Sequence, residues 1–438
     1  NITGDLPERG TAHTLAQDHV DPNLLFVGTE FGVFFSANGG QNWTEFSGLP
    51  TIAVRDLEIQ RREGDLVVVT FGRGVYIVDD YSPLRTSVDD LNDNEATVFE
   101  VKDTWLFVPD DRRGWGPKGD YGDDRYSAAN PAFGATVSYY LRDGFQSLAD
   151  QRREAEKEKA EKGEDTPYPS WDALRAEDTE LAPSVWLEVT DSEGNVVRRV
   201  EGNTGKGFHR TAWDLRYPAP DPVDLSPPPA SPAPWQSPSV GPMVVPGEYR
   251  VQLMARVRDE VKTLGEPQMF LVKPMFDGDM MAKDRRALLA FQNETARLYR
   301  AVTSADSKLS EIDDRIAHLR AAITDTPSAT ADHARTLRGI ELQAGEIHLA
   351  LDGDRTIARR YEATPMSINN RLGAIIFGHW GTQAEVPQTF RDSLAIAESQ
   401  FADVMSKLTA VEASLSGLES QLAELGAPWT PGRMPVYR

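Results

Sequence analysis

The sequence of 438 residues contains no cysteine, which excludes disulfides, thiolate zinc sites and cysteine nucleophiles. It also lacks an apolar run of the roughly 18 residues that a membrane-spanning helix needs. Basic residues are scarce, since 46 Lys and Arg face 68 Asp and Glu, and the net charge is −22. Because nucleic acids and anionic membranes are bound through Lys and Arg, this charge argues against both and favours a soluble, acidic protein.

The common enzyme motifs are absent as well. The sequence has no P-loop, no H-E-x-x-H, no G-x-S-x-G and no dinucleotide-binding fingerprint. A pair of carboxylates that hydrolyses glycosidic bonds remains an open alternative, because the 68 acids offer many candidates. Catalysis requires a particular distance between the two carboxylates in space, which their spacing in the sequence does not give. The chain begins with Asn1, inside a repeat, and we expect it to be the C-terminal part of a longer protein.

The first 85 residues contain two similar stretches, LAQDHVDPNLLFVGTEFGVFFSAN and LEIQRREGDLVVVTFGRGVYIVDD. At an offset of 42 residues and without a gap, residues of the same character pair: Leu15 with Leu57, Leu24 with Leu66, Val27 with Val69, Gly32 with Gly74, Val33 with Val75 and Phe34 with Tyr76. A period of about 40 residues with several short strands is typical of β-propeller blades. Two copies cannot close a propeller, so we expect the remaining blades upstream.

The octapeptide SANGGQNW, residues 36–43, follows the Phe-rich strand of the first copy. Ser36, Gly40 and Trp43 match the Asp-box Ser-x-Asp-x-Gly-x-x-Trp, and Asn38 stands in place of the Asp. The Asn38 side-chain oxygen is expected to accept backbone hydrogen bonds, the glycines to supply positive φ, and Trp43 to pack against a strand. Asn is a poor acid or base, so we interpret the box as a structural turn.

Four segments carry a more specific resemblance: ITGDLPERG, LLFVGTEFGVFFS, GLPTIAVRDLEIQRRE and TFGRGVYIVDDYSPLR. They resemble the last propeller blades of large exported bacterial proteins of the sortilin-like and BNR-repeat type, which carry a glycosyl hydrolase-like description. The resemblance is strongest over residues 2–85 and implies an extracellular or periplasmic location. The hydrolase description comes from xyloglucanase-like propellers, whose catalytic carboxylates match no position here, so catalytic residues stay unknown.

Residues 86–276 have the alternating pattern of short strands and resemble an Ig-like or fibronectin-like β-sandwich. Strands are expected at 96–101, 104–109, 135–143, 185–202 (a hairpin), 208–217, 247–257 and 267–274. Two insertions interrupt them. Residues 151–165 are almost wholly charged and predict a short exposed helix, whereas residues 218–246 hold 11 of the 29 prolines and predict an extended loop.

The loop at 110–131 combines glycines, aromatic residues and acids, and three interpretations remain open. It could form a glycan-binding surface, or its acids could hold Ca²⁺, which prefers several oxygen ligands. Alternatively, its aromatic side chains fasten the loop to the propeller while Arg112, Arg113 and Arg125 neutralise the acids. The candidate ligand-binding residues are Trp115, Asp120, Tyr121, Asp123, Asp124 and Tyr126.

From residue 277 to residue 427, apolar residues recur every three or four positions. This heptad pattern predicts an antiparallel helical bundle of two long and two shorter helices, followed by a tail at 428–438. Glu346 and His348 are two residues apart, so they lie on different helical faces and do not form the Glu-x-x-His of a di-iron site; we expect them at the surface. No other cofactor is predicted. The helices could also support oligomerisation.

The sequence therefore predicts propeller blades at 1–85, the sandwich at 86–276, and the helical bundle. For function it favours non-catalytic binding or scaffolding at the cell exterior, toward glycans or proteins. The alternative is part of a glycoside hydrolase of the xyloglucanase-like type, whose catalytic acids lie upstream.

Overall fold

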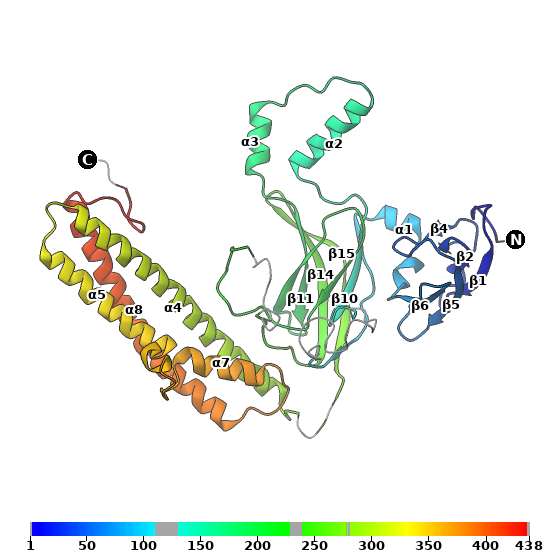
Figure 1. Cartoon of the computed structure of the whole chain (residues 1–438). Coiled ribbons are helices and arrows are strands. Elements are labelled where there is room, and N and C mark those ends of the chain that lie inside the picture. The colour runs from blue at the N-terminus through cyan, green and yellow to red at the C-terminus, as the bar shows by residue number, and fades with distance from the viewer. Residues whose placement is uncertain (1, 110–129, 228–238, 277, 279–280, 436–438) are drawn as a thin grey trace. The chain divides into compact units, whose positions relative to one another are not determined.

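The computed structural model describes residues 2–109, 130–227, 239–276, 278 and 281–435. The chain has mixed β and α structure and divides into two compact units. The first comprises Asn1–Thr104, Ala128–Asp214 and Gly247–Lys273, and the second comprises Trp105–Ser127, Leu215–Pro246 and Pro274–Arg438. Strands make up most of the regular structure of the first unit, and helices make up most of that of the second (Figure 1).

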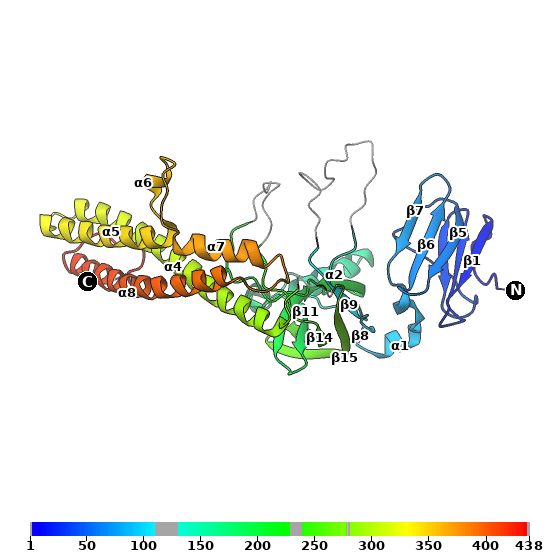
Figure 2. The same cartoon turned by 90° about the horizontal axis from the view of Figure 1, so that it is seen from below.

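The first unit begins with two antiparallel sheets. One has the order β1-β2-β3-β4, with strands Ala12–Gln17, Leu25–Thr29, Gly32–Ser36 and Thr44–Glu45. The other has the order β5-β6-β7, with strands Val54–Gln60, Asp65–Thr70 and Val75–Val78. The two sheets share one hydrophobic core, and Figure 2 shows them lying face to face. A 3₁₀ turn at Ser82–Arg85 and the short helix α1, Val88–Asp93, follow the second sheet.

The strand pairing corrects the gapless comparison of the two repeats. Thr29 Oγ1 donates to the Gly32 carbonyl at 3.0 Å, and Thr70 Oγ1 donates to the Gly74 carbonyl at 2.7 Å, so these turns are equivalent. The second turn is therefore one residue longer. Across β2 and β6 the offset is 41, which is 70 minus 29, and Val27 corresponds to Val68 rather than Val69.

With this register the sheets stack front to back. The face of the first sheet that carries Phe26 and Val33 packs on the face of the second that carries Leu66 and Val68. The residues equivalent to Leu66 and Val68 are Leu25 and Val27, which lie on the opposite face of the first sheet with Trp43. The two sheets therefore meet through non-equivalent faces.

A buried carboxylate joins these sheets. The Asp18 side chain follows β1 and accepts a two-point hydrogen bond from the Arg85 guanidinium, at 2.8 Å from Nε and 3.0 Å from Nη2. The Tyr81 hydroxyl donates to it at 2.6 Å, and the Asp21 backbone N–H at 2.8 Å. Burial alone raises the pKa of Asp18, but the bonds from Arg85, Tyr81 and the backbone outweigh burial and hold the pKa well below its usual range.

Two further sheets complete the first unit. Their orders are β13-β10-β8 and β12-β11-β14-β15-β9. Trp213 of β13 is 1 % exposed and contacts Tyr249 of β14 and Phe270 of β15, with ring centroids 5.4 and 6.3 Å away, so the sheets pack face to face. The strands are β8 Ala96–Val98, β9 Thr104–Leu106, β10 Ala135–Leu141, β11 Ser184–Asp191, β12 Val196–Gly202, β13 Gly207–Trp213, β14 Gly247–Val257 and β15 Glu260–Pro274.

The charged insertion forms a helical hairpin. Helix α2, Leu148–Glu161, has the exposed charged surface expected of residues 151–165. Its partner α3, Trp171–Thr179, was not predicted from the sequence. The Arg152 guanidinium joins them by donating to both carboxylate oxygens of Glu177 at 2.7 and 2.9 Å. The proline-rich insertion contains neither helix nor named strand within its described parts, 218–227 and 239–246.

The second unit is dominated by helices: α4 Arg285–Asp325, α5 Ala331–Asp352, α6 Arg355–Ala358, α7 Ile368–His379 and α8 Gln388–Glu424. Their heptad residues fill one continuous core. Helices α4 and α8 run parallel, because Arg391 packs on Phe291 near their starts and Arg315 meets Glu419 near their ends. An antiparallel bundle of two long and two shorter helices was expected, and α5 and α7 both run back along α4, whose 41 residues span about 60 Å (Figure 2). The sequence did not indicate that the two long helices, α4 and α8, are the parallel pair.

A second buried charge lies in this core. Arg315, 5 % exposed, donates to both oxygens of Glu419 at 2.9 and 2.8 Å and to those of Glu412 at 2.8 and 2.9 Å. Gly432 of the tail lies directly over the guanidinium, and a Cβ at that position would come within 2.9 Å of Nε. The cluster therefore fixes the parallel register of α4 and α8 and the path of the tail.

We predict that Asp18→Asn destabilises the first unit by about 3 kcal/mol at pH 7, since it leaves the Arg85 charge without its buried partner. The folded pKa of Asp18 is depressed, so its contribution is full above the unfolded value of about 4 and declines as the pH falls below it. Urea denaturation should show the difference between wild type and variant shrinking toward about pH 3. Glu63→Gln, at an exposed pair, is the control; an equal loss there would contradict the account.

We predict that Arg315→Met destabilises the helical unit by about 3–5 kcal/mol, because it leaves the buried Glu419 carboxylate unpaired. Arg338→Met removes an exposed pair with Glu341 and should cost less than about 1 kcal/mol. Thermal and chemical unfolding of both variants at neutral pH measures the difference. Similar losses for the two variants would mean that the buried cluster has no special role.

Candidate functional site

The described side chains form a groove in the first unit, of about 540 Å³, which we call the sheet groove. It lies where β3 and β4, the segment 78–84, and strands β10 and β13 come together. Its apolar walls are Phe35, Phe46, Val78, Tyr81, Pro83, Leu84 and Phe208. Its polar groups are supplied by Thr44, Glu45, Ser47, Asp79, Asp80, Ser138, His209 and Arg210.

Hydrogen bonds hold the segment that forms one wall. Arg210 of β13 donates to the carbonyls of Asp79 and Asp80 at 2.7 and 2.8 Å. Asp80 adopts a left-handed backbone, with φ 44°, which Asp tolerates better than most residues. Its N–H donates to Asp65 Oδ1 at 2.9 Å, and its carboxylate pairs with Lys102 Nζ at 3.0 Å. Together with the buried Tyr81–Asp18 bond, these contacts make this wall of the groove rigid.

Aromatic rings also line the groove. Phe208 is 49 % exposed although its ring stacks on Phe99, with centroids 5.7 Å apart and planes 15° from parallel. Phe35 and Phe46 meet edge to face at 6.0 Å. The carboxylates of Glu45 and Asp79 are exposed at the rim. A cavity that combines an exposed aromatic ring with carboxylates that form no ion pair among the described residues can bind a ligand with both apolar and hydroxyl surface.

The Asp-box residues 36–43 lie between the groove residues Phe35 and Thr44 in the sequence, but their side chains stabilise a turn. Ser36 Oγ accepts the Gly40 N–H at 2.9 Å, and Asn38 Oδ1 accepts the Asn42 N–H at 2.9 Å. Gly40 has φ 85°, and Trp43, 8 % exposed, donates from Nε1 to the Ile2 carbonyl at 2.9 Å. The polar atoms of the box thus have partners within the turn or in the N-terminal segment at Ile2 and Asp5, and the box residues do not line the sheet groove.

Other sequence candidates do not gather into a site. Trp115, Asp120, Tyr121, Asp123, Asp124 and Tyr126 lie outside the described residues. His348 is paired with Asp313 at 2.7 Å and Glu346 with Lys407 at 2.9 Å, both at the helical surface. Among the described residues, no group of three or more His, Asp and Glu side chains has the arrangement of a metal site.

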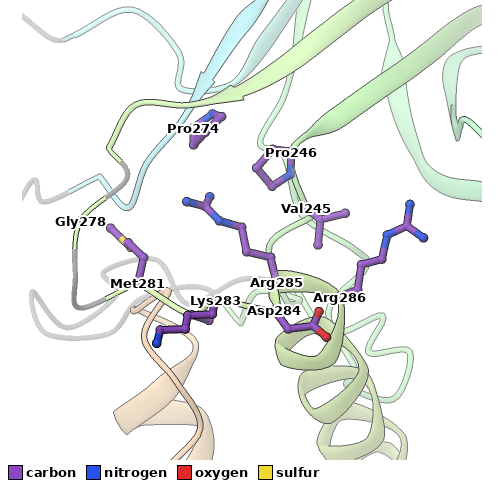
Figure 3. Close-up of a pocket in the computed structure, with 10 residues that line it drawn as sticks. Val245, Pro246, Pro274, Gly278, Met281, Lys283, Asp284, Arg285 and Arg286 are labelled. Carbon is purple, nitrogen blue, oxygen red and sulfur yellow. The ribbon is translucent and has the colours of Figure 1, made fainter.

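A larger cavity, of about 1090 Å³, lies in the second unit at the start of α4. Figure 3 shows Lys283, Arg285 and Arg286 pointing in different directions from this helix end, so their charges do not converge. Asp284 already caps the helix by accepting the Ala287 N–H at 2.9 Å. The sheet groove, whose polar and aromatic groups share one cavity, is therefore the better candidate.

We predict that Asn38→Asp keeps the Asp-box turn, because a carboxylate oxygen can accept the same Asn42 N–H and Ser36 hydroxyl, and loses only the exposed bond from Asn38 Nδ2 to Asn42 Oδ1. Asn38→Ala should cost about 1 kcal/mol of folding free energy, since it leaves the Ser36 hydroxyl and the Asn42 amide without their acceptor. Thermal unfolding of the two variants distinguishes them. Equal melting temperatures for Ala and Asp would show that the side chain plays no part in the turn.

Comparisons with known proteins do not assign a family. No protein-family model and no curated protein matches the chain. Among solved structures, the chain is similar to the extracellular domain of a B. thetaiotaomicron protein assigned as a hybrid two-component system, with 9 % identity over 62 % of this chain and 26 % of that one and a TM-score of 0.15. A second structure, assigned as a one-component system from the same species, shows 10 % identity over 61 % and 25 % and a TM-score of 0.14. The chain spans about a quarter of the length of those structures, and TM-scores this low support no conclusion about its fold or function.

Proposed function

We propose that this chain is the non-catalytic binding part of an exported β-propeller protein and that the sheet groove binds a glycan. The observation that carries the proposal is one cavity lined by the exposed ring of Phe208 and by the exposed carboxylates of Glu45 and Asp79, which form no ion pair among the described residues. The C–H face of a sugar ring packs on an aromatic ring, while its hydroxyls need acceptors and donors at the edge. Both requirements are met in a groove of about 540 Å³.

The polar rim supports a neutral or mildly basic sugar better than an acidic one. Glu45 and Asp79 contribute negative charge, whereas Arg210 is engaged with the Asp79 and Asp80 carbonyls. His209 is likewise engaged, with Nε2 at 2.6 Å from the Gly205 carbonyl. A uronic or sulfated sugar would meet repulsion from two carboxylates and from a chain of net charge −22.

The propeller part of the proposal is supported by front-to-back stacking. In the second sheet the face that would receive another sheet carries Val67, Val69, Val75 and Ile77. Val75 is 59 % and Ile77 61 % exposed, whereas the equivalent residues of the first sheet, Val33 and Phe35, face the shared core. A further blade on this face would bury it. The Ig-like description of the sandwich and the extracellular or periplasmic location stay part of the same proposal.

The location proposal comes from the family resemblance. In the part of the chain that the structure describes, no helix combines the length and apolarity needed to cross a membrane.

We predict that a panel of oligosaccharides, including β-glucan and xyloglucan fragments, contains a ligand whose affinity falls at least about tenfold in Phe208→Ala, as for loss of a central aromatic contact. Phe71→Ala, which removes a 65 % exposed ring outside the groove, is the matched control. Calorimetry measures binding, and product analysis of the same mixtures measures hydrolysis. An affinity that is unchanged in Phe208→Ala would contradict the proposed site. Hydrolysis by this chain would favour the glycoside hydrolase alternative.

A further inference from the structure

The segment between α5 and α7 carries an aromatic residue held entirely in solvent. Residues 353–367 include α6 and stand away from the long helices (Figure 2). Tyr361 in this segment is 99 % exposed and has a left-handed backbone, with φ 59°. Its N–H donates to the Ala358 carbonyl at 3.0 Å, which fixes the turn. A non-glycine residue in this conformation is strained, and such strain gathers at sites of recognition.

Two arginines directly precede this tyrosine, and Glu362 follows it. Arg359 and Arg360 are exposed, and within the described residues neither forms an ion pair, whereas Arg355 is paired with Asp352 at 2.9 Å. Arg360 donates to the neutral Thr356 carbonyl at 2.7 Å. We call Arg359, Arg360 and Tyr361 the α6 tip. It is a local basic and aromatic surface on a chain of net charge −22, and Tyr and Arg are the residues most enriched among interface hot spots.

A complementary cavity lies at the foot of the same segment. It has a volume of about 430 Å³ and runs between α5 and α8, and we call it the α5–α8 groove. Its apolar lining includes Leu349, Ile357 and Met366, which are 52, 37 and 45 % exposed. Asp403 of α8 lies in its lining, is exposed, and has no ion pair within the described residues. Lys407 and Asp354 line it too, but Lys407 is paired with Glu346 at 2.9 Å and Asp354 caps α6. The groove thus offers apolar area beside one carboxylate, that of Asp403, without an ion pair among the described residues.

We propose that a second copy of this chain docks here, with the α6 tip of each copy in the α5–α8 groove of the other. Tyr361 covers the apolar lining, and Arg359 and Arg360 approach Asp403 of the partner copy. The tip and the groove belong to one surface, so a two-fold axis beside α6 makes both contacts at once, as a self-complementary interface requires. The occupant is a second copy because the chain itself carries both the free arginines and the free carboxylate.

The test is sedimentation equilibrium of the whole chain at neutral pH and physiological salt, where long-range repulsion between two acidic copies is screened. Wild type should dimerise with rising concentration. Tyr361→Ala should weaken the dimer at least about tenfold, as expected for a hot spot. Phe377→Ala, which removes an 88 % exposed ring on α7 outside the groove, is the matched control and should leave the dimer unchanged. Unaltered helical circular dichroism would show that both variants are folded.

Charge reversal tests the pairing itself. Asp403→Arg alone and the double variant Arg359→Glu/Arg360→Glu alone should each weaken the dimer, and the triple variant should recover part of the loss. A chain that stays monomeric at the highest attainable concentration overturns the proposal, as does a dimer indifferent to Tyr361 and Asp403. Glycan binding is measured separately, so neither outcome depends on the sheet groove.

Discussion

The first unit depends on one buried negative charge. A carboxylate removed from water is tolerated only when hydrogen bonds replace its hydration, and Asp18 receives them from Arg85, Tyr81 and the backbone. Burial raises the pKa of Tyr81 and its bond to Asp18 raises it further, so the hydroxyl stays a donor at any ordinary pH. The donors come from the segment that follows the second sheet, whereas the acceptor follows the first strand of the first sheet. The interaction therefore fixes how the two sheets stack and where the chain goes next.

The path of the segment 78–84 forms one side of the sheet groove. Because Tyr81 is held from one side by Asp18 and the Asp79 and Asp80 carbonyls are held from the other by Arg210, the segment is clamped between the stacked sheets and β13. The left-handed backbone at Asp80 turns the chain at this point. A rigid wall together with an exposed aromatic ring suits recognition, since little conformational entropy is lost when a ligand binds.

The periodicity of apolar residues predicted where strands and helices lie better than it predicted which of them pack together. The alternation at residues 185–202 predicted the β11–β12 hairpin, and the apolar periodicity over residues 277–427 predicted the helical region that contains α4, α5, α7 and α8. The gapless repeat was wrong across β2 and β6, because a turn can gain a residue at a glycine without changing the apolar pattern. Heptads also mark a buried face without saying which helices share it, so the parallel α4 and α8 were missed. In the sequence QDHVDP, nothing distinguishes Asp18 from an exposed acid in a turn, so its burial could not be predicted. The sheet groove brings together residues between positions 35 and 210, and no local sequence motif links them.

The central claim is that a clamped segment and an exposed aromatic wall form one binding site. Hydrogen exchange of the whole chain, with and without the tightest-binding oligosaccharide of the panel, tests it most directly. The account predicts that the ligand slows exchange at 44–47, 78–84 and 207–210 together, because these segments line one groove. Slowed exchange confined to other parts of the chain, with none in these three segments, would contradict it.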